Sequence, residues 1–274
     1  MNQYQKKIVN GKIYSLLSGL IWGICGILGE YFFTHYQVSS GWITSMRLTL
    51  AGSLVLIWSA IQLKSQVLDI WRDKKNYLPF LAYAILGIFS VQYFFYLCVE
   101  YSNATTATIL QFISPVFILF YNRLVYQKRA SKSAVFYVLV AMLGVMFNVI
   151  LPQPFAKRYG FVPTVGWGMI LAGLFSNVLS PVYQLSFTLD IWSILICLII
   201  AFFGTAFAFF ISMKAVSLVS PLVVSVISAS EPLSSALLSV LFLGLVVDWS
   251  LLLAIALIIL PMIFLSIEEA KESR

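Results

Sequence analysis

Residues 13–33 read IYSLLSGLIWGICGILGEYFF, and eight further apolar runs follow along the chain. A helix needs roughly 20 apolar residues to cross the hydrocarbon core of a bilayer, and lipid-exposed backbone must satisfy its own hydrogen bonds. Runs of this length therefore predict transmembrane helices. A transmembrane β-barrel would instead show alternating segments of about ten residues, which this sequence lacks.

The composition indicates the same class of protein. The chain is 61% hydrophobic and 10% charged, whereas soluble domains carry about 25% charged residues. The net charge of +7 does not indicate nucleic-acid binding, because the cations lie in short segments between the apolar runs. The three cysteines, Cys25, Cys98 and Cys197, lie within apolar runs without metal-ligand spacing, which favours packing thiols. The expected partner is the lipid bilayer, and no cofactor or metal is expected.

Nine spans are predicted, joined by connections too short to form a soluble domain. They cover residues 13–33, 42–63, 78–99, 104–124, 134–151, 165–183, 191–213, 221–243 and 251–267. We therefore expect an all-α, polytopic helix bundle that forms a single multi-pass domain in the cell membrane.

The cations between the spans predict the orientation of the first four spans. Lys6, Lys7 and Lys12 place the N-terminus in the cytoplasm, because cytoplasmic segments are enriched in Lys and Arg. Residues 34–41 and the turn near Tyr101 carry no cation. The cytoplasmic connections in between carry the following cations: Lys64, Arg72, Lys74, Lys75, Arg123, Lys128, Arg129 and Lys132.

The fifth span breaks this alternation. Residues 152–163 should lie outside after five crossings, yet they contain Lys157 and Arg158. Alternation then resumes, since residues 184–190 and 244–248 carry no cation, whereas Lys214 marks the connection between them and Lys271 and Arg274 end the chain. Either one helix is missing or one predicted span does not cross.

An internal repeat favours the missing helix. A shift of 117 positions aligns Gly87 with Gly204 and Pro115 with Pro232, and a shift of 121 aligns residues 50–52 with 171–173. The second, third and fourth spans thus match the sixth, seventh and eighth. We predict a five-helix repeat over residues 1–151 and an incomplete four-helix repeat over residues 152–274.

Two charged residues within the spans are the strongest candidates for function, because an unpaired charge costs a few kcal/mol at the bilayer centre. Glu231 could accept a proton or pair with a substrate amine. It could also be a structural partner of a backbone group or of Arg47. Arg47 lies near the start of its span and could extend to the interface instead. Pro115 and Pro232 are candidate helix kinks, although each could be merely tolerated.

Polar and aromatic residues on the other helices suit a cavity for an organic solute, which is held by stacking and a few hydrogen bonds. Routine helix packing is the alternative for each. With the two charges above, the candidates are Trp22, Arg47, Gln92, Tyr93, Tyr96, Gln111 and Glu231.

Motifs of nucleotide-driven or enzymatic chemistry are absent from the sequence. There is no phosphate-binding Gly-rich loop with Lys, no HExxH pair and no GxSxG elbow. An enzyme is therefore not expected, and uphill transport would need an ion or solute gradient.

Two stretches resemble the EamA-type drug/metabolite transporter superfamily. One runs from Tyr101 through Gln111 to Pro115, and the other from Gly204 through Pro221 to Pro232. The resemblance implies ten helices in two inverted five-helix repeats, both termini in the cytoplasm, a central cavity, and export or exchange of small metabolites such as amino acids or their derivatives.

The sequence departs from the family pattern between residues 150 and 163, where the sixth helix would lie. Loss of that helix would turn the following four over and place Lys157, Arg158 and Lys214 outside, against the positive-inside preference. Alternatively, residues 134–151 do not fully span. The expected function is secondary transport of small organic metabolites, and the alternative is a non-transporting remnant or membrane assembly subunit. The sequence does not specify the oligomeric state.

Overall fold

A computed structural model describes residues 3–109, 111, 151–219, 221–228, 230–247, 249, 252, 255 and 256. These residues form helices and short connections, and none of them forms a strand. Five helical segments are long and apolar enough to span a membrane: Gln5–Tyr36, Ser40–Trp71, Lys74–Tyr101, Phe161–Leu179 and Ile191–Val216. They correspond to the first, second, third, sixth and seventh predicted spans, and this confirms the all-α membrane class. All of the fifth predicted span except Leu151, almost all of the ninth and most of the fourth lie outside the described residues.

The first two spans form an antiparallel pair joined by a tight connection. Helix α1 (Gln3–Tyr36) and helix α2 (Ser40–Leu63) are separated by three residues, of which Gln37 has a positive φ of 52°. Ser39 caps α2 by accepting a hydrogen bond from the Trp42 backbone N–H, which satisfies one of the orphan donors of that helix end. A 3-10 segment, η1 (Lys64–Trp71), continues α2.

The third and seventh spans share an interruption that the apolar pattern does not reveal. A short 3-10 turn, η2 (Lys74–Asn76), precedes α3 (Tyr77–Ala82), η3 (Tyr83–Phe89) and α4 (Ser90–Tyr101), while the seventh span contains α9 (Ile191–Ala201), η4 (Phe202–Phe207) and α10 (Ala208–Val216). Both η3 and η4 are π-helical, and each contains one member of the predicted pair Gly87 and Gly204. The wider turn thus recurs at corresponding places in the two halves.

The sixth predicted span is shifted toward the N-terminus relative to its predicted bounds. Helix α8 runs from Phe161 to Leu179 rather than over residues 165–183. It ends there because Ser180 precedes Pro181, and the residue before a proline is disfavoured in the α conformation; Ser180 has φ −145° and ψ 89°. A seven-residue helix, α7 (Gln153–Tyr159), precedes α8.

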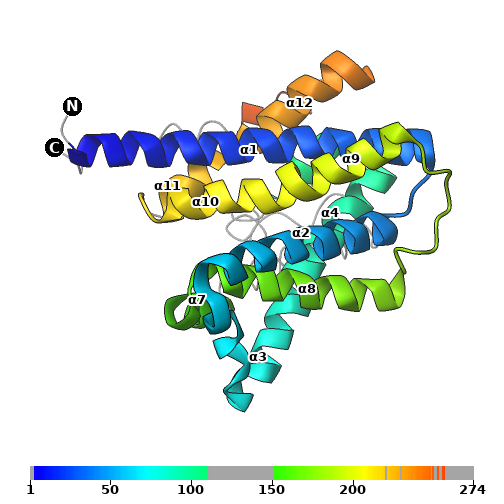
Figure 1. The fold of residues 1–274 in the computed structure, drawn as a ribbon. Coiled ribbons are helices and arrows are strands. Elements are labelled where there is room, and N and C mark those ends of the chain that lie inside the picture. The colour runs from blue at the N-terminus through cyan, green and yellow to red at the C-terminus, as the bar shows by residue number, and fades with distance from the viewer. Residues whose placement is uncertain are drawn as a thin grey trace, which may run out of the picture.

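The helices gather in two groups, which Figure 1 shows one above the other. In one group, α2 packs along α8, and α8 also packs on η3. In the other, α1 packs on α10, α11 (Pro221–Ser228) and α12 (Ser230–Leu243). The eighth predicted span thus contains α11 and α12, of which α12 is a shorter apolar helix.

Two glycines allow α2 and α8 to approach closely. A Cβ added at Gly52 would lie 2.8 Å from the backbone nitrogen of Ile170, and one added at Gly173 would lie 3.0 Å from the backbone nitrogen of Thr49. These are the two glycines that the shift of 121 positions aligns. Repeat-equivalent helices therefore pack against each other at equivalent small residues.

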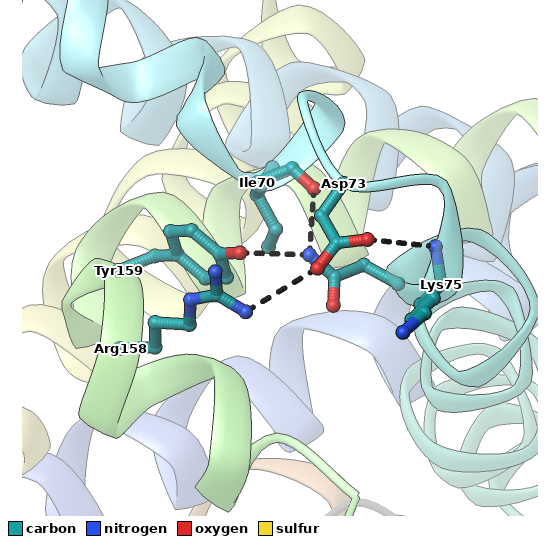
Figure 2. A network of polar contacts seen from close by, with 6 residues as sticks. Ile70, Asp73, Lys75, Arg158 and Tyr159 are labelled. Carbon is teal, nitrogen blue, oxygen red and sulfur yellow. Dashed lines mark hydrogen bonds and ion pairs between the residues drawn. The ribbon is translucent and has the colours of Figure 1, made fainter.

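Polar contacts fix α7 beside the connection between α2 and α3, as Figure 2 shows. Arg158 forms an ion pair of 3.4 Å with Asp73, and Asn76 donates a hydrogen bond of 2.8 Å to the Tyr159 hydroxyl. Asn76 also donates to the Ile70 carbonyl. Residues 157 and 158 therefore lie at the same end of the bundle as residues 64–76, and not at the opposite end as five complete crossings would require.

The cation-bearing segments meet at this end of the molecule (Figure 1). They are the first turns of α1, the η1–η2 connection, α7 and the last turn of α10, where the Lys214 ammonium lies 5.6 Å from the centroid of the Tyr14 ring. The other end of the bundle carries the carboxylates Glu30, Glu100 and Asp190. No Lys or Arg among the described residues lies beside them. The cations of the two halves, as far as these are described, thus lie at the same end of the bundle.

Candidate functional site

Arg47 lies on the side of α2 that faces the other half of the molecule. Its side chain does not extend to the interface: only 5% of the residue is exposed. Nε donates to the Thr205 hydroxyl, Nη1 to the Tyr96 hydroxyl at 3.0 Å and Nη2 to the Gly204 carbonyl at 2.9 Å. The guanidinium also lies 5.3 Å from the centroid of the Tyr96 ring. Arg47 therefore joins α2, α4 and η4 at membrane depth.

The π-helical turn η4 supplies two of these three acceptors. Gly204 and Thr205 lie in its centre, and Thr205 donates its own hydroxyl proton to the Ile200 carbonyl, five residues back. That bond orients the hydroxyl oxygen as an acceptor for Arg47. Short π-helical turns often occur at functional sites, and here the turn presents a carbonyl and a hydroxyl to one cation.

Glu231 is the second buried charge, with 6% of the residue exposed. It lies in the first turn of α12. The backbone there is close to α1: a Cβ added at Gly23 would lie 2.7 Å from the Glu231 carbonyl oxygen. Arg47 and Glu231 are the buried charged residues of the described part of the chain. The two side chains nevertheless do not form an ion pair within 4 Å, since the ion pairs of the described residues are Asp69–Arg72 and Asp73–Arg158.

Cys25 lies two residues after Gly23 on α1, the helix that packs against Glu231. A Cβ added at Gly204 would lie 2.7 Å from Cys25 Cβ, so Cys25 packs on η4. Arg47, Glu231, Tyr96, Thr205 and Gly204, together with Cys25, form what we call the central polar cluster. It is built from α1, α2, α4, η4 and α12.

The structure brings three predicted site residues, Arg47, Tyr96 and Glu231, into this cluster. Trp22 packs edge-on against Phe209 at a centroid distance of 5.5 Å. Tyr93 is half-buried and stacks on Phe89 at 5.2 Å, and Gln92 is buried. Among the described residues, no hydrogen bond or aromatic contact joins these three side chains to the cluster, so their part in a cavity stays a prediction.

The remaining predicted residues are Gln111 and the two candidate kinks, Pro115 and Pro232. Gln111 is helical and half-buried, whereas Pro115 lies outside the described residues. Pro232 is buried within α12, directly after Glu231. Its role as a kink stays a prediction, because proline is tolerated in the first turn of a helix.

Thr205 and Gly204 are cluster residues that we did not predict as site residues. Threonine and glycine are common in transmembrane helices, so their identities carry little information. The available signal was the repeat itself, since Gly204 aligns with Gly87, but an aligned glycine does not reveal that its carbonyl accepts a hydrogen bond from an arginine.

Three comparisons with known proteins agree with this architecture. The EamA-like transporter family model matches the chain twice, over residues 9–150 and 148–267. The uncharacterized inner membrane transporter YicL of Salmonella typhimurium is 30% identical over 301 aligned positions, which cover 96% of this chain and 97% of that protein. A protein crystal structure with 15% sequence identity has a TM-score of 0.66 and covers 96% of this chain and 99% of its own, which shows the shared fold alone. The chain belongs to the EamA-like transporter family, within the drug/metabolite transporter superfamily.

Proposed function

We propose that this chain is a secondary transporter, an exporter or exchanger, that moves a small organic metabolite across the cell membrane. Family membership supports transport as the general activity. The observation that carries the proposal is the burial of Arg47 and Glu231 at membrane depth without an ion pair between them. Charges inside a membrane are costly, and they usually line substrate or ion pathways.

The arrangement of the helices supports a transport cycle. Alternating access in carriers built from inverted repeats is largely a rocking of one helix group against the other around a site near the midplane. The central polar cluster lies where the α2–α8 group meets the group of α1, η4 and α12. We propose that Glu231 exchanges a proton or pairs with a substrate amine there, and that Tyr96 and Arg47 contact the substrate.

The membrane orientation and the repeat boundaries are part of this proposal. We place the N-terminus and the cation-bearing end in the cytoplasm, the first repeat over residues 1–151 and the incomplete second repeat over residues 152–274. Because α7 lies beside residues 64–76, we place α7 at the cytoplasmic end as well.

One observation favours the alternative of a non-transporting remnant or assembly subunit. The alignment with YicL spans 301 positions, more than the 274 residues of this chain, so the relative has residues without a counterpart here. A bundle that has lost a helix would expose polar groups to lipid, and each unsatisfied group costs several kcal/mol there.

Reconstitution separates the two proposals. Purified protein in liposomes is loaded with a defined mixture of amino acids, nucleosides and sugars, and the solutes released into buffer are measured by mass spectrometry. A transporter releases at least one solute faster than protein-free liposomes do. A remnant gives low detergent-soluble yield or release no faster than the protein-free control.

A further inference from the structure

The described residues use only part of the hydrogen-bond capacity of Arg47. A guanidinium has five N–H donors: one on Nε and two on each terminal nitrogen. Three of them, one each on Nε, Nη1 and Nη2, donate hydrogen bonds to described residues. One N–H on each terminal nitrogen is therefore left without an acceptor among the described residues. These are the two nitrogens with which arginine forms its end-on, bidentate pair with a carboxylate.

The three acceptors that Arg47 does contact do not neutralise its charge. The hydroxyls of Thr205 and Tyr96 and the carbonyl of Gly204 are all uncharged, and Glu231 is not within ion-pairing distance. Buried charges in proteins are normally paired. A buried, positioned guanidinium with spare donors is thus suited to an anionic group that arrives from outside the chain.

Helix packing alone does not require a cation at this place. The shift of 121 positions aligns Arg47 with Gly168, and the shift of 117 aligns Thr205 with Ile88. A Cβ added at Gly168 would lie 2.7 Å from Ile88 Cδ1 and 2.7 Å from a ring carbon of Tyr83, so the equivalent contact between α8 and η3 is made without a charged side chain. The arginine and threonine are therefore specific to one half, as expected for a ligand site rather than for a repeated packing device.

We propose that Arg47 binds a carboxylate of the transported solute, and that Thr205 and Gly204 position the guanidinium for it. The solute class is then an organic acid or another small molecule that carries a planar carboxylate. This inference rests on the proposed transport function, because it names the substrate of the same site. Thr205 acts through Arg47 and is a positioning residue.

Thermal unfolding of the full-length protein in detergent tests the carboxylate directly. Tryptophan fluorescence is followed with sodium benzoate, phenylacetate or acetate, and with benzamide, phenylacetamide or acetamide as uncharged counterparts, all at equal ionic strength. An acid present at about ten times its Kd should raise the Tm by roughly 2–4 °C, while its amide should not.

Variants assign the effect to Arg47. Arg47→Gln should lose the acid-specific rise in Tm, and Thr205→Val should need a several-fold higher acid concentration for the same rise. Lys214→Gln is the matched control, because it removes a cation that lies at the bundle end, against Tyr14, and it should behave as wild type. If Arg47→Gln does not fold, the acid–amide difference in wild type and its weakening in Thr205→Val still decide the question.

Several results would overturn the inference: no acid raises the wild-type Tm, acids and amides act equally, or Arg47→Gln keeps the rise. These outcomes are distinct from a failure of the proposed function. An acid-specific rise without solute release from liposomes supports the carboxylate site and rejects transport. Release of a solute without a carboxylate, unchanged in Arg47→Gln, supports transport and rejects the carboxylate site.

Discussion

Arg47 Nη2 lies 2.9 Å from the carbonyl oxygen of Gly204, and this hydrogen bond connects α2 in the first half of the chain to the π-helical turn of the second. Helix α1 contacts η4 beside this hydrogen bond, because Cys25 packs on Gly204. One side chain thus joins the two helix groups at the position where the described residues bury Arg47 and Glu231.

Replacing Thr205 by Val should destabilise the protein, because it leaves the Arg47 Nε–H buried without its acceptor. An unsatisfied buried donor costs about 1–3 kcal/mol. Thr44→Val is the matched control, since the buried Thr44 hydroxyl donates only to the Ser40 carbonyl of its own helix. Thermal unfolding in detergent should give a lower Tm for Thr205→Val than for Thr44→Val. Equal Tm values would show that the Thr205 bond is unimportant.

Replacing Gly52 by Ala should separate α2 from α8. The added methyl would lie 2.8 Å from the backbone nitrogen of Ile170, which cannot rotate away, and overpacking of this kind costs about 1–3 kcal/mol. Gly26→Ala is the control, because its methyl would lie 3.5 Å from the nearest atom, Ala104 Cβ. The Tm should fall clearly for Gly52→Ala and remain within about 2 °C of wild type for Gly26→Ala. A similar Tm for both variants would contradict the close α2–α8 contact.

The sidedness of α7 can be measured by labelling single cysteines. In a background with Cys25, Cys98 and Cys197 replaced by Ala, cysteines are placed at Lys75, Lys157 and Gln184, all of which are exposed. An impermeant maleimide applied to sealed vesicles of known orientation should reach positions 75 and 157 from the same, cytoplasmic face, and position 184 from the other face. Labelling of position 184 together with position 75 from the cytoplasmic face, and of position 157 from the other face, would mean that the second half is inverted, against the contact of Arg158 with Asp73.

Asp190 gives a prediction for pH dependence at the other end of the bundle. It caps α9, and the hydrogen bond from the Ser193 backbone N–H holds the pKa of the Asp190 carboxyl below its ordinary value of 3.8. A lowered pKa means that the ionised carboxylate contributes stability above about pH 4, and this contribution is lost as the pH falls through the folded-state pKa.

Asp190→Asn keeps a capping side chain but cannot titrate in this range. The Tm of wild type should therefore fall more than that of Asp190→Asn between pH 5 and about pH 3. Parallel Tm curves for the two proteins over this interval would show that the cap does not depend on the charge.

The sequence was sufficient for the class of fold and for most span positions, because both depend on apolar length, which is a local property. The shift of α8 was missed because the effect of Pro181 on Ser180 outweighs the apolar character of residues 180–183. The π-helical turns were missed as well, since the wider turn leaves no trace in the apolar pattern.

The charged members of the site could be predicted, whereas their arrangement could not. Arg47 and Glu231 are identifiable because a charge within an apolar run is rare. The hypothesis that Arg47 extends to the interface was wrong, because Tyr96, Thr205 and Gly204 supply acceptors at depth. These partners come from distant segments, and only the packing of α2 against η4 brings them together. Whether Glu231 is a structural partner of a backbone group or of Arg47 stays a prediction, although the two side chains do not form an ion pair within 4 Å.

The role of Glu231 is tested most directly by measuring solute accumulation driven by a pH gradient in proteoliposomes. The solute is one that the liposome mixture experiment identifies, and Glu231→Gln is compared with wild type. Asp69→Asn serves as the control, since that carboxylate pairs with Arg72 on the connection between α2 and α3. The account predicts that wild type and Asp69→Asn accumulate the solute and that Glu231→Gln loses gradient-driven accumulation. Unchanged accumulation and unchanged pH dependence in Glu231→Gln would contradict it.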